Sequence, residues 1–384
     1  MPRVTRTQAL LTPLALLETI VVSACLATSE PVTLMRIPDG GRMPEAAIDR
    51  DGTIHLMYYR GAMTGGDLFY VNRSRNATEW STPTPVNSTP HSAIGMGPMD
   101  GGDMVFDQGP TDGGRIHVAW LINEPIRFVY TRNTENLAGF EPQRVLLERT
   151  DEVVEARASV TTNGRGRVFV AWHGATIEKA DDAHRAVFLM TSQNGGDSFG
   201  APVVISRQSE GACGCCSLEI FAVNDTVLVS YRGAGENVRR GQRLLKSTDG
   251  GQTFVDTLIQ PWPIAACPVT TTTFARGPDV TRVAWETQGQ VYFASIDGLA
   301  DAVSPGGEAR FRRKNPAIAT NQQGETLLAW GDAPGYRAGG TLNWQLFDAE
   351  HHPLSDPGPA TDTIPSGSTP AIVTQLDGTF VVLY

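Results

Sequence analysis

One pattern recurs along this chain and restricts the folds that it can adopt. A strand that often opens near a proline and closes on Asp or Asn is followed by a glycine turn and by an apolar strand that ends in an aromatic residue. The clearest copies occupy residues 43–59, 156–172, 315–330 and 369–384, and less regular copies end at Trp120, Tyr231 and Trp285. Inside each copy apolar and polar residues alternate with a period of two, which indicates half-buried strands, and no stretch has the periodicity of an amphipathic helix. The pattern predicts an all-β fold.

The seven copies begin roughly 45 to 60 residues apart, which is the length of a four-stranded blade in a β-propeller. The last copy, 369–384, supplies two strands, and residues 31–37 resemble the outer strand (201–206) that precedes a later copy. A strand from the N-terminal side would complete the last blade and remove the exposed edges of the ring. We therefore expect a single β-propeller domain over residues 31–384 with seven blades, the last one incomplete and closed by the N-terminal strand. Six blades are the alternative.

The balance of charge argues against one class of partner. The chain holds 31 Lys and Arg against 41 Asp and Glu, which gives a formal net charge of −10, and it has no basic cluster. Nucleic acid is therefore not expected as a partner, and direct binding to an anionic membrane surface is disfavoured for the same reason.

The first 25 residues have the features of an export signal. Arg3 and Arg6 precede an apolar run over residues 9–24 that is too short and too interrupted for a membrane span. Residues 22–25 (Val-Ser-Ala-Cys) resemble a bacterial lipobox, in which Cys25 would be lipidated after cleavage. An ordinary signal peptide or an uncleaved anchor is the alternative.

We therefore expect a signal peptide with a lipobox over residues 1–25 and a linker over residues 26–30. The mature protein would be anchored to the membrane as a lipoprotein, in the periplasm or cell envelope. Such a compartment is oxidising, which bears on the chemistry of the cysteines.

Four of the five cysteines fall in two places that a propeller brings together. Cys213, Cys215 and Cys216 precede the first strand of the fourth unit, and Cys267 precedes the first strand of the fifth. Loops that lead into the first strands of neighbouring blades gather on one face, so we expect the four side chains to meet near the mouth of the central channel. An even number of cysteines in an oxidising compartment favours disulfides that join two blades. A thiolate site for Cu or Zn is a second interpretation, although the spacing is not that of common zinc modules, and redox-active thiols are a third.

Residues 247–254 (Ser-Thr-Asp-Gly-Gly-Gln-Thr-Phe) have the form of a tight turn, because Asp-Gly-Gly supplies positions with positive φ and the Ser and Asp side chains can bond the turn's own backbone. The octet resembles the Asp box of sialidase-type (BNR repeat) β-propellers. A second copy, 192–199, carries Asn in place of Asp, and a third, 74–80, is degenerate. Together with Cys-x-Cys-Cys, these boxes resemble a bacterial subgroup of that family. The boxes indicate the fold and not an activity.

Sialidases of this family bind the substrate carboxylate through three arginines, the first of which lies in an Arg-Ile-Pro motif. Arg42-Met43-Pro44 is similar to that motif, so the resemblance implies that Arg42 contacts a substrate carboxylate, which a planar guanidinium fits bidentately. Alternatively, Pro44 is the proline that opens a repeat and Arg42 is a surface residue. Four further arginines follow second strands and would reach the same face: Arg60, Arg232, Arg240 and Arg337. The Tyr/Glu nucleophile pair and the Asp acid of the family cannot be assigned here.

These observations support three hypotheses about function. The first is a non-catalytic binding or scaffold protein, for example an extrinsic periplasmic subunit of a membrane complex, whose partner is a protein at the membrane surface or a glycan. The second is an exo-sialidase-type glycoside hydrolase, which rests on Arg42 and the Asp boxes. The third is a periplasmic protein that binds Cu or Zn through Cys213, Cys215, Cys216 and Cys267. No other cofactor is indicated.

Overall fold

The computed structural model describes residues 1–2, 30–108, 114–123, 125–134, 137–149, 156–175, 177, 180–307, 309, 311–335 and 339–384. The chain divides into two units, Met1–Glu30 and Pro31–Tyr384. Nearly all of the predicted signal peptide and linker, Cys25 included, lies outside the described residues. Within the described ranges, no helix is long and apolar enough to cross a membrane.

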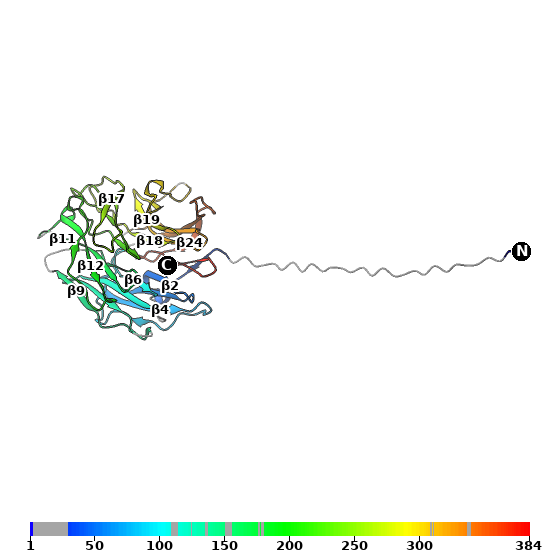
Figure 1. Ribbon diagram of the computed structural model, residues 1–384, viewed down its shortest axis with the longest axis horizontal. Helices are drawn as coiled ribbons and strands as arrows, with labels where there is room; N and C mark the ends of the chain where they lie inside the picture. The colour runs from blue at the N-terminus through cyan, green and yellow to red at the C-terminus, as the bar shows by residue number, and fades with distance from the viewer. Residues whose placement is uncertain are drawn as a thin grey trace. The chain divides into compact units, whose positions relative to one another are not determined.

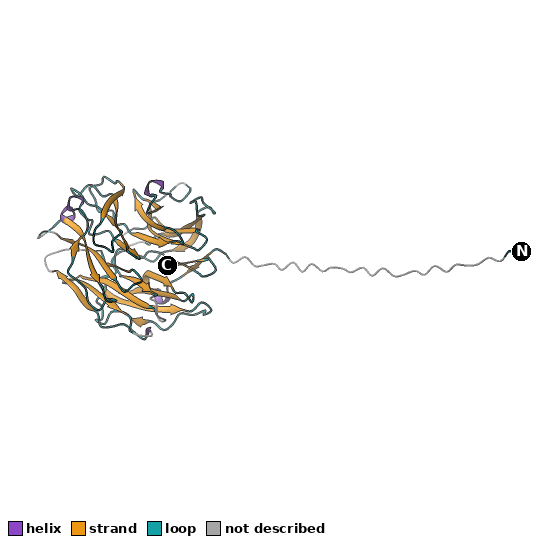
Figure 2. Ribbon diagram, in the orientation of Figure 1, coloured by secondary structure: helices purple, strands orange, loops and turns teal. Residues whose placement is uncertain are grey.

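The unit Pro31–Tyr384 is a β-propeller of seven small sheets that follow one another round a ring (Figure 1, Figure 2). Blades one and two contain β2 (Arg42–Ile48), β3 (Ile54–Ala62), β4 (Gly65–Arg73) and β5 (Thr84–Pro85), then β6 (Gly102–Asp107), β7 (Arg115–Asn123), β8 (Ile126–Arg132) and β9 (Arg144–Arg149). Blades three and four contain β10 (Ser159–Thr162), β11 (Val168–Ala175), β12 (Arg185–Ser192) and β13 (Val203–Val204), then β14 (Glu219–Val223), β15 (Thr226–Arg232), β16 (Gln242–Ser247) and β17 (Val255–Gln260). Blades five to seven contain β18 (Thr272–Arg276), β19 (Thr281–Thr287) and β20 (Gln290–Ser295), then β21 (Arg313–Thr320), β22 (Thr326–Asp332), β23 (Thr341–Phe347) and β24 (Gly358–Thr363), then β25 (Ala371–Thr374), β26 (Phe380–Leu383) and β1 (Val32–Met35). Consecutive strands within a blade are antiparallel, except at the join between the two ends of the ring.

That join is made by β1, which pairs in parallel with β26 so that Val32 lies opposite Phe380 and Leu34 opposite Val382. In Figure 1 the blue start of the ring accordingly meets its red end. The prediction of seven blades, with a last blade closed by the N-terminal strand, is confirmed, and the six-bladed alternative is wrong.

The fifth blade differs from expectation, because six blades were predicted to be complete and this one has three strands. Its fourth position is reduced to a single antiparallel bridge between Phe293 and Val303. A 3-10 helix, Leu299–Asp301, occupies the segment just before the bridge, so an outer strand cannot extend there.

Large aromatic side chains at the ends of the second strands form the core between blades. Trp120, Trp172, Trp285 and Trp330 are fully buried, as are Tyr59 and Tyr231 at the equivalent positions of blades one and four, and Tyr384 of blade seven is buried as well. Trp172 of β11 packs with Leu121 and Phe128 of the preceding blade, so each aromatic residue joins one blade to its neighbour. This packing holds the first strands in a closed ring, in which each contacts the first strand of the next blade.

The octet at 247–254, which resembles an Asp box, makes the turn between β16 and β17. Ser247 Oγ accepts a hydrogen bond from the Gly251 N–H at 2.9 Å, and Asp249 Oδ1 accepts from the Thr253 N–H at 2.9 Å. Gly250 and Gly251 have φ of +73° and +86°, where a side chain would be strained. In the copy at 192–199, Ser192 Oγ accepts the equivalent hydrogen bond from the Gly196 N–H, so both octets stabilise a turn.

Candidate functional site

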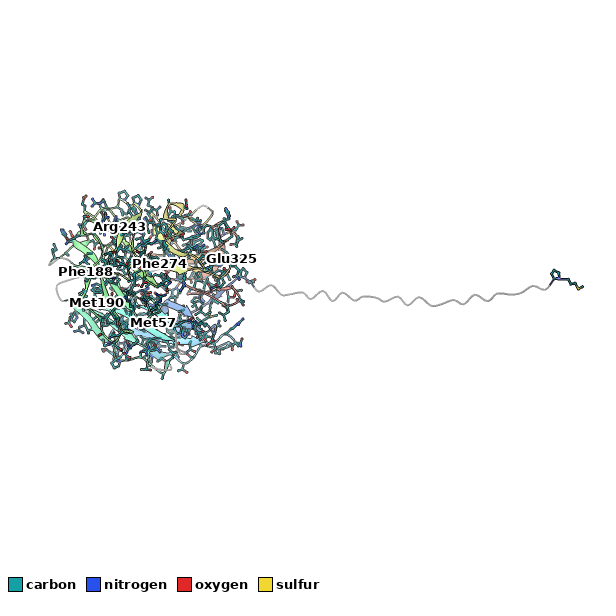
Figure 3. The ribbon with its side chains drawn as sticks, viewed as in Figure 1. Met57, Phe188, Met190, Arg243, Phe274 and Glu325 are labelled. Atoms are coloured by element: carbon teal, nitrogen blue, oxygen red, sulfur yellow. A yellow bond between two sulfur atoms is a disulfide. The ribbon has the colours of Figure 1, made fainter. Side chains whose placement is uncertain are left out.

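The seven first strands enclose an axial cavity of about 270 Å³. Phe274, which is labelled near the middle of the ring in Figure 3, lines it together with Phe106 and Phe221. Carboxyl, guanidinium and hydroxyl groups line the rest, including Glu45, Arg157 and several Ser and Thr residues. The cavity is therefore part apolar and part able to form hydrogen bonds.

Four ionisable residues from blades one to four lie near the axis, and we call them the axial cluster: Glu45, Asp103, Arg157 and Glu219. Glu45, Arg157 and Glu219 line the cavity, and Asp103 is buried beside Arg157. Arg157 Nη2 donates a hydrogen bond to Glu45 Oε1 and lies 3.7 Å from Asp103 Oδ1. Asp103 Oδ2 in turn accepts hydrogen bonds from Ser159 Oγ at 2.6 Å and from the backbone of β10. The cluster thus ties three blades together at the axis.

Burial controls the protonation of the cluster. Desolvation, with help from the Asp103 charge, raises the pKa of Glu45 to about 7 against the opposing attraction of Arg157. Burial also raises the pKa of Glu219 well above its usual range, and the Asp103 and Glu45 carboxyls act in the same direction. Burial disfavours the charge of Arg157, but the surrounding carboxylates outweigh that effect and raise its pKa.

The cluster still offers groups to a ligand. The Glu45 side chain keeps 22% of its surface exposed. Glu219 lines the cavity, and no hydrogen bond of its carboxyl group is seen within the described part of the chain. A protonated carboxyl donates one hydrogen bond and accepts others, as a sugar hydroxyl also does.

The axial cluster was not predicted from the sequence, although the sequence contains a feature that indicates it. Glu45, Asp103 and Glu219 are acidic residues in first strands, which in a propeller lie nearest the axis. Charge in such a buried strand is unusual enough to mark a site.

Arg42, the predicted contact for a substrate carboxylate, is not among the residues that line the axial cavity. Its Nη1 donates to the Ser366 carbonyl at 3.0 Å, and its guanidinium lies 5.3 Å from the centre of the Tyr59 ring. The role of Arg42 in binding a substrate stays a prediction.

Of the other four predicted arginines, Arg232 and Arg240 lie together, since Arg232 Nη1 donates to the Arg240 carbonyl at 2.9 Å. Arg60 is exposed and lies 3.5 Å from Asp39, whereas Arg240 is buried and donates to Asp182 at 2.6 Å. Arg232 is fully buried. Arg337 lies outside the described residues.

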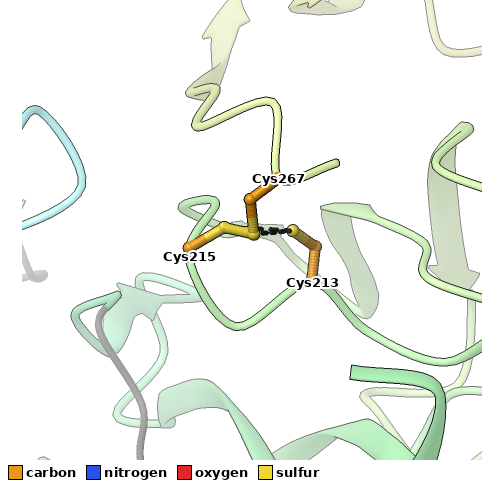
Figure 4. Close-up of side chains that lie close together, drawn as sticks. All are labelled: Cys213, Cys215 and Cys267. Carbon is orange, nitrogen blue, oxygen red and sulfur yellow. Dashed lines mark hydrogen bonds between the residues drawn. A yellow bond between two sulfur atoms is a disulfide. The ribbon is translucent and has the colours of Figure 1, made fainter. Parts of the chain in front are cut away.

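The four predicted cysteines do come together, in the loops that lead into β14 and β18. Figure 4 shows three of them, Cys213, Cys215 and Cys267. Cys215 and Cys267 form a disulfide, so the predicted bridge between two blades is confirmed. Cys213 and Cys216 are free and buried, and a second bridge of the predicted pair is not formed. Cys213 Sγ lies 3.4 Å from the sulfur of Cys215, 3.3 Å from that of Cys216 and 3.7 Å from that of Cys267. We call these residues the cysteine cluster.

The two free thiols have opposite tendencies to ionise. Burial opposes ionisation of Cys216, but the hydrogen bond from Cys213, the positive charge of Arg232 and the Thr270 N–H at 3.5 Å outweigh it and lower its pKa to about 6. The bond to Cys216, together with burial, raises the pKa of Cys213. A thiolate at Cys216 beside a thiol at Cys213 is therefore the favoured pair.

The cluster can be compared with the predicted Cu or Zn site. Sulfurs that lie this close suit a soft metal ion, for which thiolates are preferred ligands. With Cys215 and Cys267 bonded to each other, the remaining donors are Cys213 and Cys216, and a four-thiolate site requires that the disulfide be reduced. Metal binding stays a prediction.

Comparison with known proteins establishes the fold alone. No family model and no curated protein matches the chain. A variant of the lectin from Aleuria aurantia, solved with α-methyl-L-fucoside, is 10% identical, covers 85% of this chain and 96% of its own, and superposes with a TM-score of 0.51. An ulvan lyase from a new polysaccharide lyase family is 14% identical over 81% of this chain and 80% of its own, with a TM-score of 0.47. The NanB sialidase from Streptococcus pneumoniae is 13% identical over 88% of this chain and 64% of its own, with a TM-score of 0.45.

Proposed function

We propose that this protein is a non-catalytic binding propeller that holds a neutral, hydroxyl-rich ligand, such as the end of a glycan, in the axial cavity. The observation that carries the proposal is the composition of the axial cluster, in which one guanidinium faces three carboxyl groups. The fucoside complex of the Aleuria aurantia lectin, a six-bladed propeller, is a precedent for a sugar on a β-propeller, but a fold does not select its ligand.

The charge of the cluster favours a neutral ligand over an anionic sugar. A sialic acid needs guanidinium groups that are free to face its carboxylate. Arg157 already donates to Glu45 and lies near Asp103, so a second anion there would be repelled by the carboxyl groups. Neutral hydroxyls can instead donate to carboxylate oxygens and accept from protonated carboxyls and from Thr271 or Ser217, which also line the cavity.

The proposal is tested by calorimetric titration of the full exported protein with neutral and sialylated oligosaccharides. We expect neutral sugars to bind and Glu219→Gln to weaken binding by about tenfold, because one or two hydrogen bonds are altered. Glu219→Gln replaces a carboxyl whose neutral form is favoured by burial, so folding should survive. Glu148→Gln, at an exposed carboxylate on β9, is the matched control and should bind normally.

Two results would overturn the proposal. One is preferential binding of sialylated sugars that Arg42→Ala abolishes, which would support the sialidase hypothesis. The other is release of a free sugar during the titration, which would make Glu45, with its pKa of about 7, a candidate acid in a glycosidase.

Export and lipid anchoring form a separate part of the proposal, because they rest on the sequence at 1–25. Metabolic labelling with palmitate should mark the wild-type protein and fail to mark Cys25→Ser. A wild-type protein without label would remove the anchor, and with it the basis for an extrinsic subunit of a membrane complex.

A further inference from the structure

The four sulfurs of the cysteine cluster form a continuous path from the interior to the surface. Cys216 is fully buried, and its sulfur lies 3.3 Å from that of Cys213. Cys213 is in turn 3.4 Å from the nearer sulfur of the disulfide, Cys215, whose partner Cys267 is exposed. Contact between a dithiol and a disulfide along such a path is the arrangement that exchange requires.

We propose that the cysteine cluster is a thiol–disulfide exchange centre, in which the Cys213–Cys216 dithiol reduces the Cys215–Cys267 disulfide and delivers a free thiol at Cys267 to the surface. The inference is independent of the glycan proposal, since it concerns the loops before β14 and β18 and not the axial cavity.

The first step forms a bond between Cys213 and Cys215. Cys213 passes its proton to the Cys216 thiolate, along the hydrogen bond that joins them, and its sulfur attacks Cys215 Sγ. The bond between Cys215 and Cys267 breaks, and Cys267 leaves as a thiolate that takes up a proton.

The second step closes the dithiol. Cys216 loses its proton and attacks Cys213 Sγ, so a disulfide forms between Cys213 and Cys216 while Cys215 leaves and is protonated. Two electrons have moved from one cysteine pair to the other. Of the two protons on the released thiols, one comes from the Cys213 thiol and the other from solvent. No external oxidant or reductant is consumed.

The surroundings support each end of this transfer. The Arg232 guanidinium stabilises a thiolate at Cys216, which is the sulfur that must act as nucleophile in the second step. At the other end Asp182 Oδ2 lies 3.9 Å from Cys267 Sγ and can accept a hydrogen bond from the released thiol. Asp182 is itself held by Arg240 and by the Gly214 N–H at 3.1 Å, so its carboxylate is fixed in place.

The backbone is already shaped for the new disulfide. Cys213 and Cys216 are separated by two residues, and the Cys216 N–H donates to the Cys213 carbonyl at 3.2 Å in a turn. A disulfide across two intervening residues is the bridge of known redox-active pairs. Exchange therefore replaces a bond between blades four and five with a bond inside one turn.

The centre would act on a disulfide or a thiol presented from outside. A released Cys267 thiol is exposed and can attack an external disulfide, giving a mixed disulfide at that sulfur alone. We use oxidised glutathione as the probe of this chemistry.

The test uses the full exported protein, purified without reductant and quenched in acid at intervals after transfer to pH 8. Free thiols are alkylated, and disulfides are located by mass spectrometry of peptides. We expect one bridge per molecule, present as a mixture of Cys215–Cys267 and Cys213–Cys216, with alkylation or glutathione at Cys267 in the second form. Cys213→Ser should retain the Cys215–Cys267 bridge and lose all labelling of Cys267, whereas Cys216→Ser should stop at the Cys213–Cys215 bridge.

Three outcomes would overturn the proposal. Both bridges present in the same molecule would make the cluster a pair of permanent staples. If Cys267 of the wild-type protein is never alkylated or glutathionylated, the Cys215–Cys267 disulfide does not exchange. This outcome is observed on the wild-type protein and does not depend on the folding of a variant. Four free thiols with bound Cu or Zn would make the cluster a metal site.

Discussion

The axial cluster and the cysteine cluster are both built where loops and first strands of neighbouring blades converge, yet they are held together differently. The axial cluster is held by charge and hydrogen bonds across blades one to four, whereas the cysteine cluster is held by one covalent bond between blades four and five. Removing Arg157 from the first leaves buried carboxyls without a partner, whereas removing Cys215 or Cys267 from the second releases a cross-link and raises the entropy of the unfolded chain. The two regions should therefore respond differently to substitution.

The largest effect is expected from Arg157→Met, which removes the only cation of the axial cluster. The carboxyls of Glu45 and Asp103 would lose a buried partner, and we expect the free energy of unfolding to fall by about 3 to 5 kcal/mol. Urea denaturation measures the change. Arg239→Met, at an exposed pair with Glu236, is the control and should stay within about 0.5 kcal/mol.

This prediction also has an internal check. Adding Glu45→Gln to Arg157→Met should restore part of the lost stability, because one uncompensated carboxyl is removed. A loss below about 1 kcal/mol, or no rescue, would mean that water already screens the cluster.

Cys267→Ser should have the next largest effect. The bridge to Cys215 spans a sequence separation of 52 residues, and its loss should lower the free energy of unfolding by about 2 to 4 kcal/mol through the entropy of the unfolded chain. Cys213→Ser is the matched control, since it removes a buried sulfur from the same cluster but keeps the bridge. Equal losses in the two variants would indicate that packing, and not the covalent bond, stabilises these loops.

The protonation of Glu45 should give a smaller effect that depends on pH. Because the folded protein raises the pKa of this carboxyl from 4.5 to about 7, the native state binds more protons than the unfolded state between these values. Stability should therefore fall as the pH rises from about 4.5 to about 7 and level off above that range. Thermal denaturation across this interval measures the fall.

Glu286 complicates this profile, since burial raises its pKa to about 7 as well. The difference between the profiles of the wild type and Glu45→Gln isolates the axial cluster. A difference that is flat with pH would show that Glu45 is ionised in the native state throughout, and would remove its capacity to donate a proton to a ligand.

Sequence predicts the fold well here because the propeller is periodic. Seven copies of the repeat end in Trp or Tyr at the same position, and this predicts seven similar blades. The apolar residues at 31–37 predict a strand that pairs with the open edge of the last blade. The reduced fifth blade was not predictable, since one bridge at Phe293 and Val303 leaves no alternating pattern.

The two sites were predictable to different degrees for the same reason. Cys213 and Cys267 precede equivalent strands in adjacent blades, so the repeat alone places their loops together, although it does not say which sulfurs bond. Glu45 and Arg157 meet only because their side chains point to the axis, and β2 carries a register shift between Arg42 and Glu45 that sequence periodicity does not reveal.

The smallest effect is expected in the glycine turns at 192–199 and 247–254, where one serine hydroxyl bonds the backbone of its own turn. Ser247→Ala removes the acceptor for the Gly251 N–H in the turn between β16 and β17, and we expect a loss of about 1 kcal/mol in the free energy of unfolding. Ser192→Ala should cost a similar amount, because its hydroxyl accepts from the Gly196 N–H at the same distance of 2.9 Å. Ser74→Ala, in the degenerate copy that lacks the glycines, should change little. If all three cost the same, the hydroxyl acts through something other than the glycine turn. If only the first two lower the stability, the serine contributes through its hydrogen bond to the turn.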